Sequence, residues 1–253
     1  MRLDPLRLAR EPINKKMSRH IHIPSAIDWC AFLANTAEID GYLVSENELN
    51  RVRTSVAPRR YALALTNCAN TLWEFATSDS PLDPISAARQ INTMLKEGAL
   101  EEGVIKEQYT SDWREGKPIL DPETNFDARA APVVIEEWAN QIKEMDNNMV
   151  DFLERGFTTM AMQRKAGMSA WISQFQWGHI CPFPALNGVT GRFITNLLRI
   201  RWSMTMVRYD YAKGVWLKNL NDCKKIWMNQ NVLSPIEVKT YKPDLQKHEF
   251  FSL

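Results

Sequence analysis

Apolar side chains recur at every third or fourth position over much of the chain, which is the spacing of one face of an α-helix. The clearest stripes are Tyr61, Leu65, Cys68, Leu72 and Phe75, and Ile135, Trp138, Ile142 and Met145. A further stripe, Ile85, Ala88, Ile91 and Leu95, follows Asp83-Pro84 and runs to Gly98. Aspartate before a helix and proline at its first position are typical helix starts. The pattern predicts a protein of the all-α, mainly helical class.

Two other local patterns predict a helix start and a hairpin. Ser45 and Glu48 have the spacing of a capping box, in which each side chain pairs with the backbone N–H of the other residue. Between Gly103 and Asp121, short apolar runs flank a polar turn at 115–117. This second arrangement predicts a small β-hairpin over 103–121.

The 26 positions from Ala166 to Gly191 contain no Asp, Glu, Lys or Arg, although average composition would place about six there. Polar residues and two prolines interrupt this stretch, so it lacks the continuous apolar run of a transmembrane helix. Its spacing instead predicts a helix over 168–177 that stops at Gly178, then a loop, and then a second helix from Thr190 onward.

Composition narrows the classes of protein to which the chain can belong. It has 253 residues, of which 45% are hydrophobic, and 31 basic residues against 30 acidic ones. The apolar content is sufficient for a sizeable core, and the near-neutral charge argues against a surface that binds nucleic acid. We expect one domain over 25–228, with extensions over 1–24 and 229–253. The polar start lacks the apolar core of a signal peptide, which predicts a cytoplasmic protein or one delivered to a host cytosol.

Cysteine and histidine are sparse and scattered. The chain has four residues of each type, and their spacing matches neither a zinc site nor a disulfide framework. We therefore expect reduced cysteines that mostly pack in the core, and no metal site built from these residues.

The loop before the last predicted helix has the composition of an anion site. Asn187-Gly188 precedes Thr190-Gly191-Arg192 at the expected helix start. Free backbone N–H groups and the helix dipole favour negative charge there, and an arginine one turn later can hold a phosphate through two hydrogen bonds. The alternative is an ordinary Asn-Gly turn followed by a solvated arginine. The segment lacks the P-loop pattern, and its match to a GXXG RNA-binding loop lacks the basic surroundings of such loops.

The same loop resembles a degenerate form of the Fic family signature, His-Pro-Phe-x-Asp/Glu-Gly-Asn-Gly-Arg-x-x-Arg. The matching positions are Pro182, Phe183, Asn187, Gly188 and Arg192, and Thr190-Gly191 are residues often found between the two arginines. The departures are Cys181 at the catalytic His, Ala185 at the magnesium-binding acid, Leu186 at a Gly and Val189 at the first Arg.

The resemblance continues outside the signature. Thr36 to Gly41 resembles the inhibitory-helix motif of the family, Ser/Thr-x-x-x-Glu-Gly/Asn, with Asp40 in place of Glu. The predicted helices and the hairpin, which takes the position of the family's target-positioning flap, follow in the family's order. The similarity covers roughly 25–205 and implies a Fic-like helical domain with a β-hairpin flap.

Membership of this family implies a transferase that moves AMP from ATP onto a hydroxyl group of a protein. By this resemblance, Asn187, Gly188, Thr190, Gly191 and Arg192 bind the phosphates of ATP or of another phosphate-containing donor. Ala185 argues against bound magnesium, because magnesium prefers oxygen ligands. Asp40 is expected to pair with Arg192 and to regulate phosphate binding; the alternative is a surface acid in a turn.

The catalytic role is the most open part of the prediction. Cys181 stands at the position of the family's histidine, where it could act as a thiolate base or nucleophile, or simply pack as a small apolar residue. His179 is a further candidate base, or a structural histidine near a helix end. The hypotheses are a divergent nucleotidyltransferase, a pseudoenzyme that senses nucleotides or binds a protein partner through the 103–121 hairpin, and a transferase for another phosphate-containing donor.

Overall fold

The computed structural model describes residues 21–52, 55, 57–106, 113–114, 131–156 and 159–209. The helices in this part are α2 (Ala26–Ile39), α3 (Glu46–Arg51), α4 (Arg60–Thr77), α5 (Pro84–Glu101), α6 (Ala131–Glu154), α7 (Met160–Ile180) and α8 (Asn187–Arg201). No strand occurs among the described residues. The all-α prediction is confirmed for this part of the chain.

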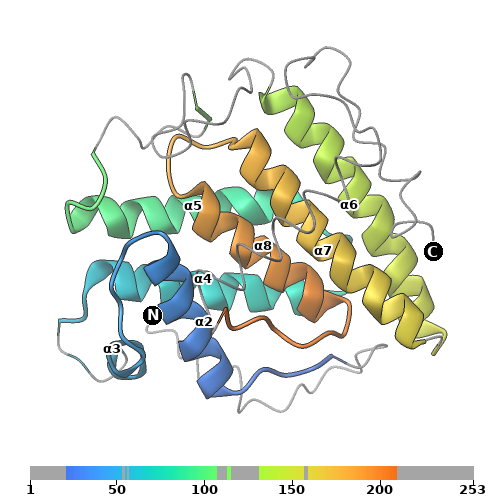
Figure 1. The fold of residues 1–253 in the computed structure, drawn as a ribbon, viewed down its shortest axis with the longest axis horizontal. Coiled ribbons are helices and arrows are strands. Elements are labelled where there is room, and N and C mark those ends of the chain that lie inside the picture. Colours follow the sequence, from blue (N-terminus) through green and yellow to red (C-terminus); the bar gives the residue numbers. More distant parts are fainter. Residues whose placement is uncertain are drawn as a thin grey trace.

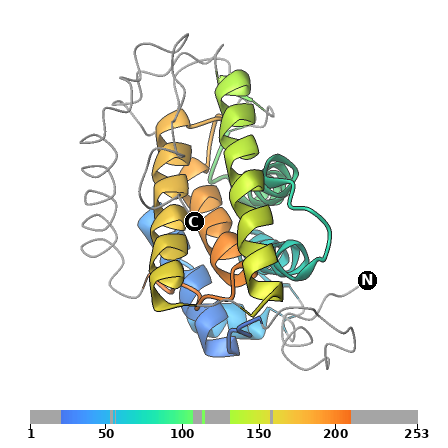
Figure 2. The ribbon, with the colours of Figure 1, turned by 90° about the vertical axis from the view of Figure 1, so that its right-hand side faces the viewer.

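Helix α8 lies at the centre of the arrangement, and the other long helices surround it (Figure 1). Figure 2 looks roughly along α4 and α5, which lie side by side, and shows α6 and α7 running next to one another from the top to the bottom of the view. Of the fifteen residues of α8, thirteen are buried, and Phe193, Leu198 and Ile200 are fully inaccessible. A helix that is buried on nearly all sides forms the core of its domain. The last residues of the predicted signature, from Asn187 to Arg192, therefore lie in the central helix of the molecule.

Helix starts follow the sequence signals closely. Ser45 accepts a hydrogen bond from the Glu48 N–H at 3.2 Å, as the sequence predicted, and Asp83 caps α5 ahead of Pro84. The full reciprocal capping box lies at Ser25 and Asp28, at the start of α2, where the sequence analysis had not placed one.

Two predicted helix ends are wrong. Helix α5 continues past Gly98 to Glu101, and a Cβ at Gly98 would lie 2.6 Å from the Ala64 Cβ; this glycine therefore allows α4 and α5 to approach closely rather than ending a helix. Helix α7 begins at Met160 and continues through Gly178 to Ile180. The left-handed residue that follows α7 is Cys181, with φ 44°.

The start of α8 and the hairpin also depart from the prediction. Helix α8 begins at Asn187 rather than at Thr190. The predicted β-hairpin finds no support, since 103–106 and 113–114 contain no strand; the rest of 103–121 lies outside the described residues. The proposed domain limit at 228 and the C-terminal extension also fall outside them.

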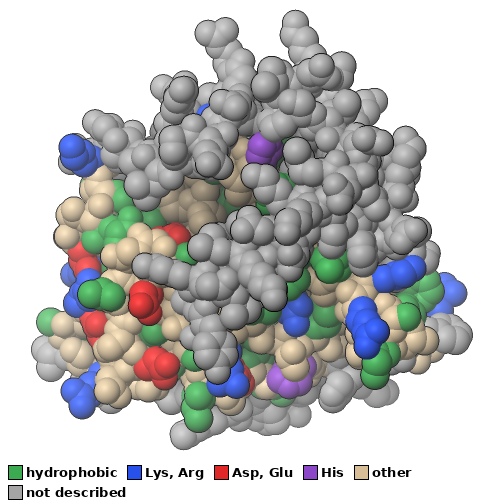
Figure 3. All heavy atoms as spheres, viewed as in Figure 1, with side chains coloured by type: hydrophobic (Ala, Val, Ile, Leu, Met, Phe, Trp, Pro, Cys, Tyr) green, Lys and Arg blue, Asp and Glu red, His purple; other side chains and the backbone are tan. Residues whose placement is uncertain are grey.

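Charged side chains of both signs alternate over α3 and the adjoining ends of α4 and α5 (Figure 3). Arg59 Nη2 lies 2.8 Å from Glu102 Oε2, and Arg59 Nε lies 3.5 Å from Glu48 Oε1. Arg60 Nε lies 3.0 Å from Glu101 Oε2. Exposed pairs of this kind add little stability.

Within the described part of the chain, none of the helices combines the length and the apolar character needed to cross a membrane.

Candidate anion site at the start of helix α8

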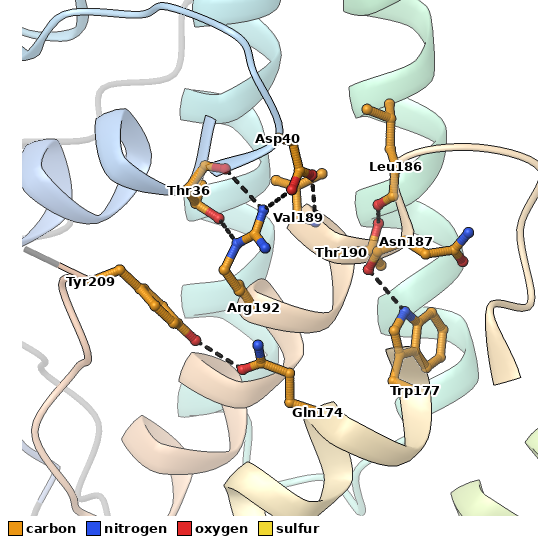
Figure 4. Close-up of polar contacts among 10 residues, drawn as sticks. All are labelled: Thr36, Asp40, Gln174, Trp177, Leu186, Asn187, Val189, Thr190, Arg192 and Tyr209. Carbon is orange, nitrogen blue, oxygen red and sulfur yellow. Dashed lines mark hydrogen bonds and ion pairs between the residues drawn. The ribbon is translucent and has the colours of Figure 1, made fainter. Parts of the chain in front are cut away.

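Arg192 is the centre of the candidate site, and its guanidinium is buried. Its side chain is 1% exposed. Nε donates a hydrogen bond to the Thr36 hydroxyl at 2.5 Å, and Nη2 donates to the Thr36 carbonyl at 2.9 Å and to Asp40 Oδ1 at 2.5 Å. Figure 4 shows Thr36 and Asp40 reaching Arg192 from α2 and the turn that follows it. The first and fifth residues of the predicted inhibitory motif therefore both contact the arginine of the predicted signature.

Asp40 also occupies the N-terminus of α8. The Val189 N–H, in the first turn of this helix, donates to Asp40 Oδ2 at 2.9 Å. One carboxylate thus accepts from a helix-start N–H through one oxygen and from a buried guanidinium through the other (Figure 4). Free N–H groups and the helix dipole favour an anion at this position. At the position where the sequence pattern predicted an anion, the structure has the carboxylate of Asp40.

The turn after α2 directs Asp40 toward α8. Asp40 is the C-cap residue of α2, and its N–H donates to the Ala37 carbonyl at 3.1 Å. Gly41 follows with φ +89°, a conformation that side chains disfavour. Tyr42 then donates its N–H to the same Ala37 carbonyl at 2.9 Å. The Asp-Gly pair is therefore a helix-ending turn, and tertiary packing makes its acid part of the site.

Gly188 leaves the space that the carboxylate fills. A Cβ at this position would lie 2.9 Å from Asp40 Oδ1 and 3.3 Å from Arg192 Nη1. Any side chain at 188 would displace the pair. Gly188 is therefore the residue that allows the Asp40 carboxylate to lie against the first turn of α8.

Asn187 organises the loop with both ends of its side chain. Its Nδ2 donates to the Phe183 carbonyl at 2.7 Å, and its Oδ1 accepts from the Phe183 N–H at 3.0 Å. Its backbone carbonyl accepts from Trp177 Nε1 at 3.2 Å. Two hydrogen bonds to one residue fix the loop over 183–187 in a single geometry, so Asn187 acts here as a brace of the loop.

Thr190 and Gly191 face the interior of the molecule. Thr190 donates its hydroxyl to the Leu186 carbonyl at 2.8 Å and accepts from Asn92 Nδ2 at 3.0 Å. A Cβ at Gly191 would lie 2.9 Å from Trp177, so this glycine allows α7 and α8 to pack closely. In the structure Thr190 braces the loop, and Gly191 allows the close packing of α7 and α8.

Asn92 is a buried polar residue of the loop region that the sequence analysis did not identify. It reaches from α5 and also donates to the Ala185 carbonyl at 3.1 Å. It lies on the buried stripe of α5, next to Ile91. A polar residue adjoining an apolar stripe was the only available signal, and α5 can be seen to face this loop only after folding.

Cys181 is buried, 4% exposed, and its Sγ donates to the Gly178 carbonyl at 2.7 Å. Its backbone and that of Leu186 are both left-handed, with φ 44° and 61°. Residues other than glycine adopt this conformation at a cost of about 1–3 kcal/mol. At Leu186, where the Fic pattern has Gly, the backbone therefore keeps the conformation that a glycine would adopt without that cost.

Trp113 and Arg114 lie along the start of the loop. The Arg114 N–H donates to the Pro182 carbonyl at 3.0 Å, and its Nη2 donates to the Ile180 carbonyl at 3.2 Å. Trp113 stacks on Phe183 with ring centroids 5.5 Å apart, and the Arg89 guanidinium lies 4.8 Å from the Trp113 centroid. Part of the predicted flap segment therefore contacts the predicted signature, without forming a strand.

The charge of Arg192 acts on two buried tyrosines, Tyr61 and Tyr209. Burial raises the pKa of Tyr61 well above 10, and the negative charge of Asp40 raises it further while Arg192 lowers it. Burial also raises the pKa of Tyr209, an effect that Arg192 partly offsets; its hydroxyl hydrogen-bonds with Gln174 Oε1 at 2.9 Å. Both phenols stay protonated at neutral pH; Tyr209 uses its proton in the bond to Gln174, whereas the Tyr61 hydroxyl has no hydrogen-bond partner.

Three or more potential metal ligands of the His, Cys, Asp and Glu types do not cluster anywhere in the described part of the chain. The chain matches no protein-family model, no curated protein and no solved structure. The Fic-like identity and the nucleotide-binding roles of Asn187, Gly188 and Arg192 therefore remain predictions from the sequence pattern.

Proposed function

We propose that this protein binds a phosphate group of a nucleotide or a phosphorylated small molecule at the N-terminus of α8, and that Asp40 competes for that site. The observation that supports this proposal is the double engagement of one carboxylate by the Val189 N–H and Arg192. Phosphate oxygens accept the same hydrogen bonds, and arginine with a helix N-terminus is a strong combination for phosphate.

Binding without turnover is the form of this proposal that the geometry favours. The thiol of Cys181 is buried and donates to a helix carbonyl, and positions 185 and 189 carry Ala and Val. Proton transfer needs a base within hydrogen-bonding reach of the reacting group. A regulated phosphate-binding protein, in the sense of a Fic-like pseudoenzyme, fits these residues best.

A divergent nucleotidyltransferase is the second candidate, and one contact favours it. The Arg114 N–H donates to the Pro182 carbonyl, directly beside Cys181. The Fic resemblance puts the element that positions a target protein beside the signature. Transfer of AMP to a hydroxyl group would require Cys181, or a group of the substrate, to take the proton.

Thermal unfolding with ATP, GTP, a nucleotide sugar and pyrophosphate tests the binding proposal. Asp40→Ala opens the site and should increase stabilisation by phosphate ligands, whereas Arg192→Ala should abolish it. A ligand at one hundred times its Kd adds about 2.7 kcal/mol, which is about 5–10 °C for a chain of this size. Glu38→Ala removes a charge from the same helix end, is exposed, and serves as the control. Equal shifts in the Asp40 and Arg192 variants would refute the proposal.

Turnover separates the two candidates. Labelled ATP is incubated with a panel of proteins and with either the Asp40→Ala variant or the Asp40→Ala/Cys181→Ala double variant. The pseudoenzyme form predicts binding in both and label transfer in neither. Label transfer that depends on Cys181 would favour the transferase.

A further inference from the structure

We propose that the hydroxyl of Tyr61 is a third hydrogen-bond donor of the anion site at the start of α8. It makes no hydrogen bond while Asp40 occupies the site, and it favours phosphate over carboxylate ligands when Asp40 is displaced. This inference rests on the proposed phosphate site and adds a specificity-determining residue to it.

The C-terminal ends of α4 and α8 lie together, and Tyr61 lies at the opposite end of α4, where its ring contacts Tyr42 in the turn that carries Asp40. At the C-terminal end of α8, Arg201 donates to the carbonyls of Phe75 and Ser78 at the end of α4. Tyr61 belongs to the first turn of α4, and Val189 and Gly188 belong to that of α8.

The Tyr61 hydroxyl is buried without a hydrogen-bond partner. The whole residue is inaccessible, and the oxygen makes no hydrogen bond in the structure. Its ring packs edge-on against Tyr42, two residues after Asp40, with centroids 5.2 Å apart. Most buried polar groups are paired, and each exception calls for an explanation. A donor that is used only when an external ligand is bound supplies one.

The electrostatic surroundings connect this hydroxyl to the site. Burial raises the pKa of the Tyr61 hydroxyl well above 10. The negative charge of Asp40 raises this pKa further, and the positive charge of Arg192 lowers it. Both charges of the Asp40–Arg192 pair therefore lie close enough to shift the pKa of this hydroxyl. The phenol keeps its proton at neutral pH and is a donor rather than an acceptor.

A phosphate group can use this donor, whereas the present carboxylate does not. Oδ1 of Asp40 is held by Arg192 and Oδ2 by the Val189 N–H. A terminal phosphate has three acceptor oxygens, so one remains after these two donors are satisfied. A hydrogen bond from Tyr61 to that oxygen would favour phosphate over a carboxylate in the same position.

The test measures the affinity of inorganic phosphate and of acetate for the full chain carrying Asp40→Ala, with and without Tyr61→Phe. A lost hydrogen bond to a charged oxygen lowers affinity by about tenfold or more. We expect the Phe variant to bind phosphate at least about tenfold more weakly and acetate equally well. Tyr61→Phe removes a group without a protein partner, so thermal stability in the Asp40 form should be equal or higher.

Tyr209→Phe is the matched control, because its hydroxyl is already bonded to Gln174, and its phosphate-to-acetate ratio should not change. Phosphate binding that needs Arg192 but is unchanged by Tyr61→Phe would overturn this inference alone. Failure of the Asp40→Ala protein to bind phosphate at all would instead refute the proposed function.

Discussion

Helix α8 carries a buried arginine–aspartate pair at each end, and the two pairs differ in how completely they are enclosed. At the C-terminal end, Arg201 and Asp146 are 2% and 1% exposed, and their closest atoms lie 2.7 Å apart. At the N-terminal end, Arg192 is 1% exposed but Asp40 is 16% exposed. The first pair is sealed within the core, whereas the acid of the second pair borders solvent.

The partners of the two arginines differ in the same way. Arg201 also donates to the carbonyls of Phe75, Ser78 and Ser80, and Asp146 accepts from Trp202 Nε1. These contacts tie α8 to α6 and to the α4–α5 connection. Arg192 is held by Thr36 and Asp40 of a single segment, α2 and its C-cap. A fully bonded pair is suited to holding the fold, and a pair with one solvent-bordering acid is suited to exchanging that acid for a ligand.

The largest expected effect is at the sealed end. Asp146→Ala leaves Arg201 charged and buried without its carboxylate, and breaking such a pair costs about 3–5 kcal/mol. Asp40→Ala should cost less, because water or an anion can reach the vacated position. Urea denaturation of both variants, with and without phosphate, measures the difference. We expect phosphate to restore stability to the Asp40 variant only; rescue of Asp146→Ala would remove the distinction between the ends.

A smaller effect should separate Gly188 from Gly178. Alanine at 178 meets no atom within 4 Å and should stabilise α7 by up to about 1 kcal/mol. Alanine at 188 meets Asp40 at 2.9 Å and should destabilise the wild type. In an Asp40→Ala background that penalty should vanish, which a double-mutant cycle detects as a coupling free energy. Additivity of the two substitutions would contradict the contact.

The smallest expected effect concerns pH. Burial raises the pKa values of Tyr61 and Tyr209 above their ordinary value of 10.0 in the folded state. The unfolded chain therefore loses these protons first, and stability present below pH 10 is lost as the pH rises. At pH 10 each tyrosine should remove about 0.4 kcal/mol. Denaturation at pH 7 and pH 10 should show a smaller loss in Tyr61→Phe and in Tyr209→Phe; an unchanged loss would argue against their burial.

Helix type and most helix starts could be predicted from the sequence, because caps and apolar stripes are local signals. Ser45 and Asp83 were found in this way. The helix ends at Gly98 and Gly178 were predicted wrongly, since a glycine that ends a helix and one that lies within a helix look the same in sequence. At Gly98 an added Cβ would lie 2.6 Å from the Ala64 Cβ, so this glycine permits close packing, whereas at Gly178 it would meet no atom within 4 Å.

The candidate site was predictable in part. The expected contact between Asp40 and Arg192 came from the resemblance of two motifs about 150 positions apart, and the structure contains that contact. The bracing roles of Asn187, Thr190 and Asn92 were not foreseen, because each depends on which backbone groups the folded loop presents.

Apolar periodicity and helix caps act over a few residues, so the sequence alone predicted the helical class that the described residues show, and an anion-binding pattern at a helix start. The contacts between distant segments came only with tertiary packing: Asp40 accepts hydrogen bonds from Val189 and Arg192, the Tyr61 hydroxyl is buried without a hydrogen-bond partner, and Arg201 is enclosed in the core. These outcomes depend on which surfaces are buried together and on which polar groups remain unpaired, and both are fixed only when helices distant in sequence pack against one another.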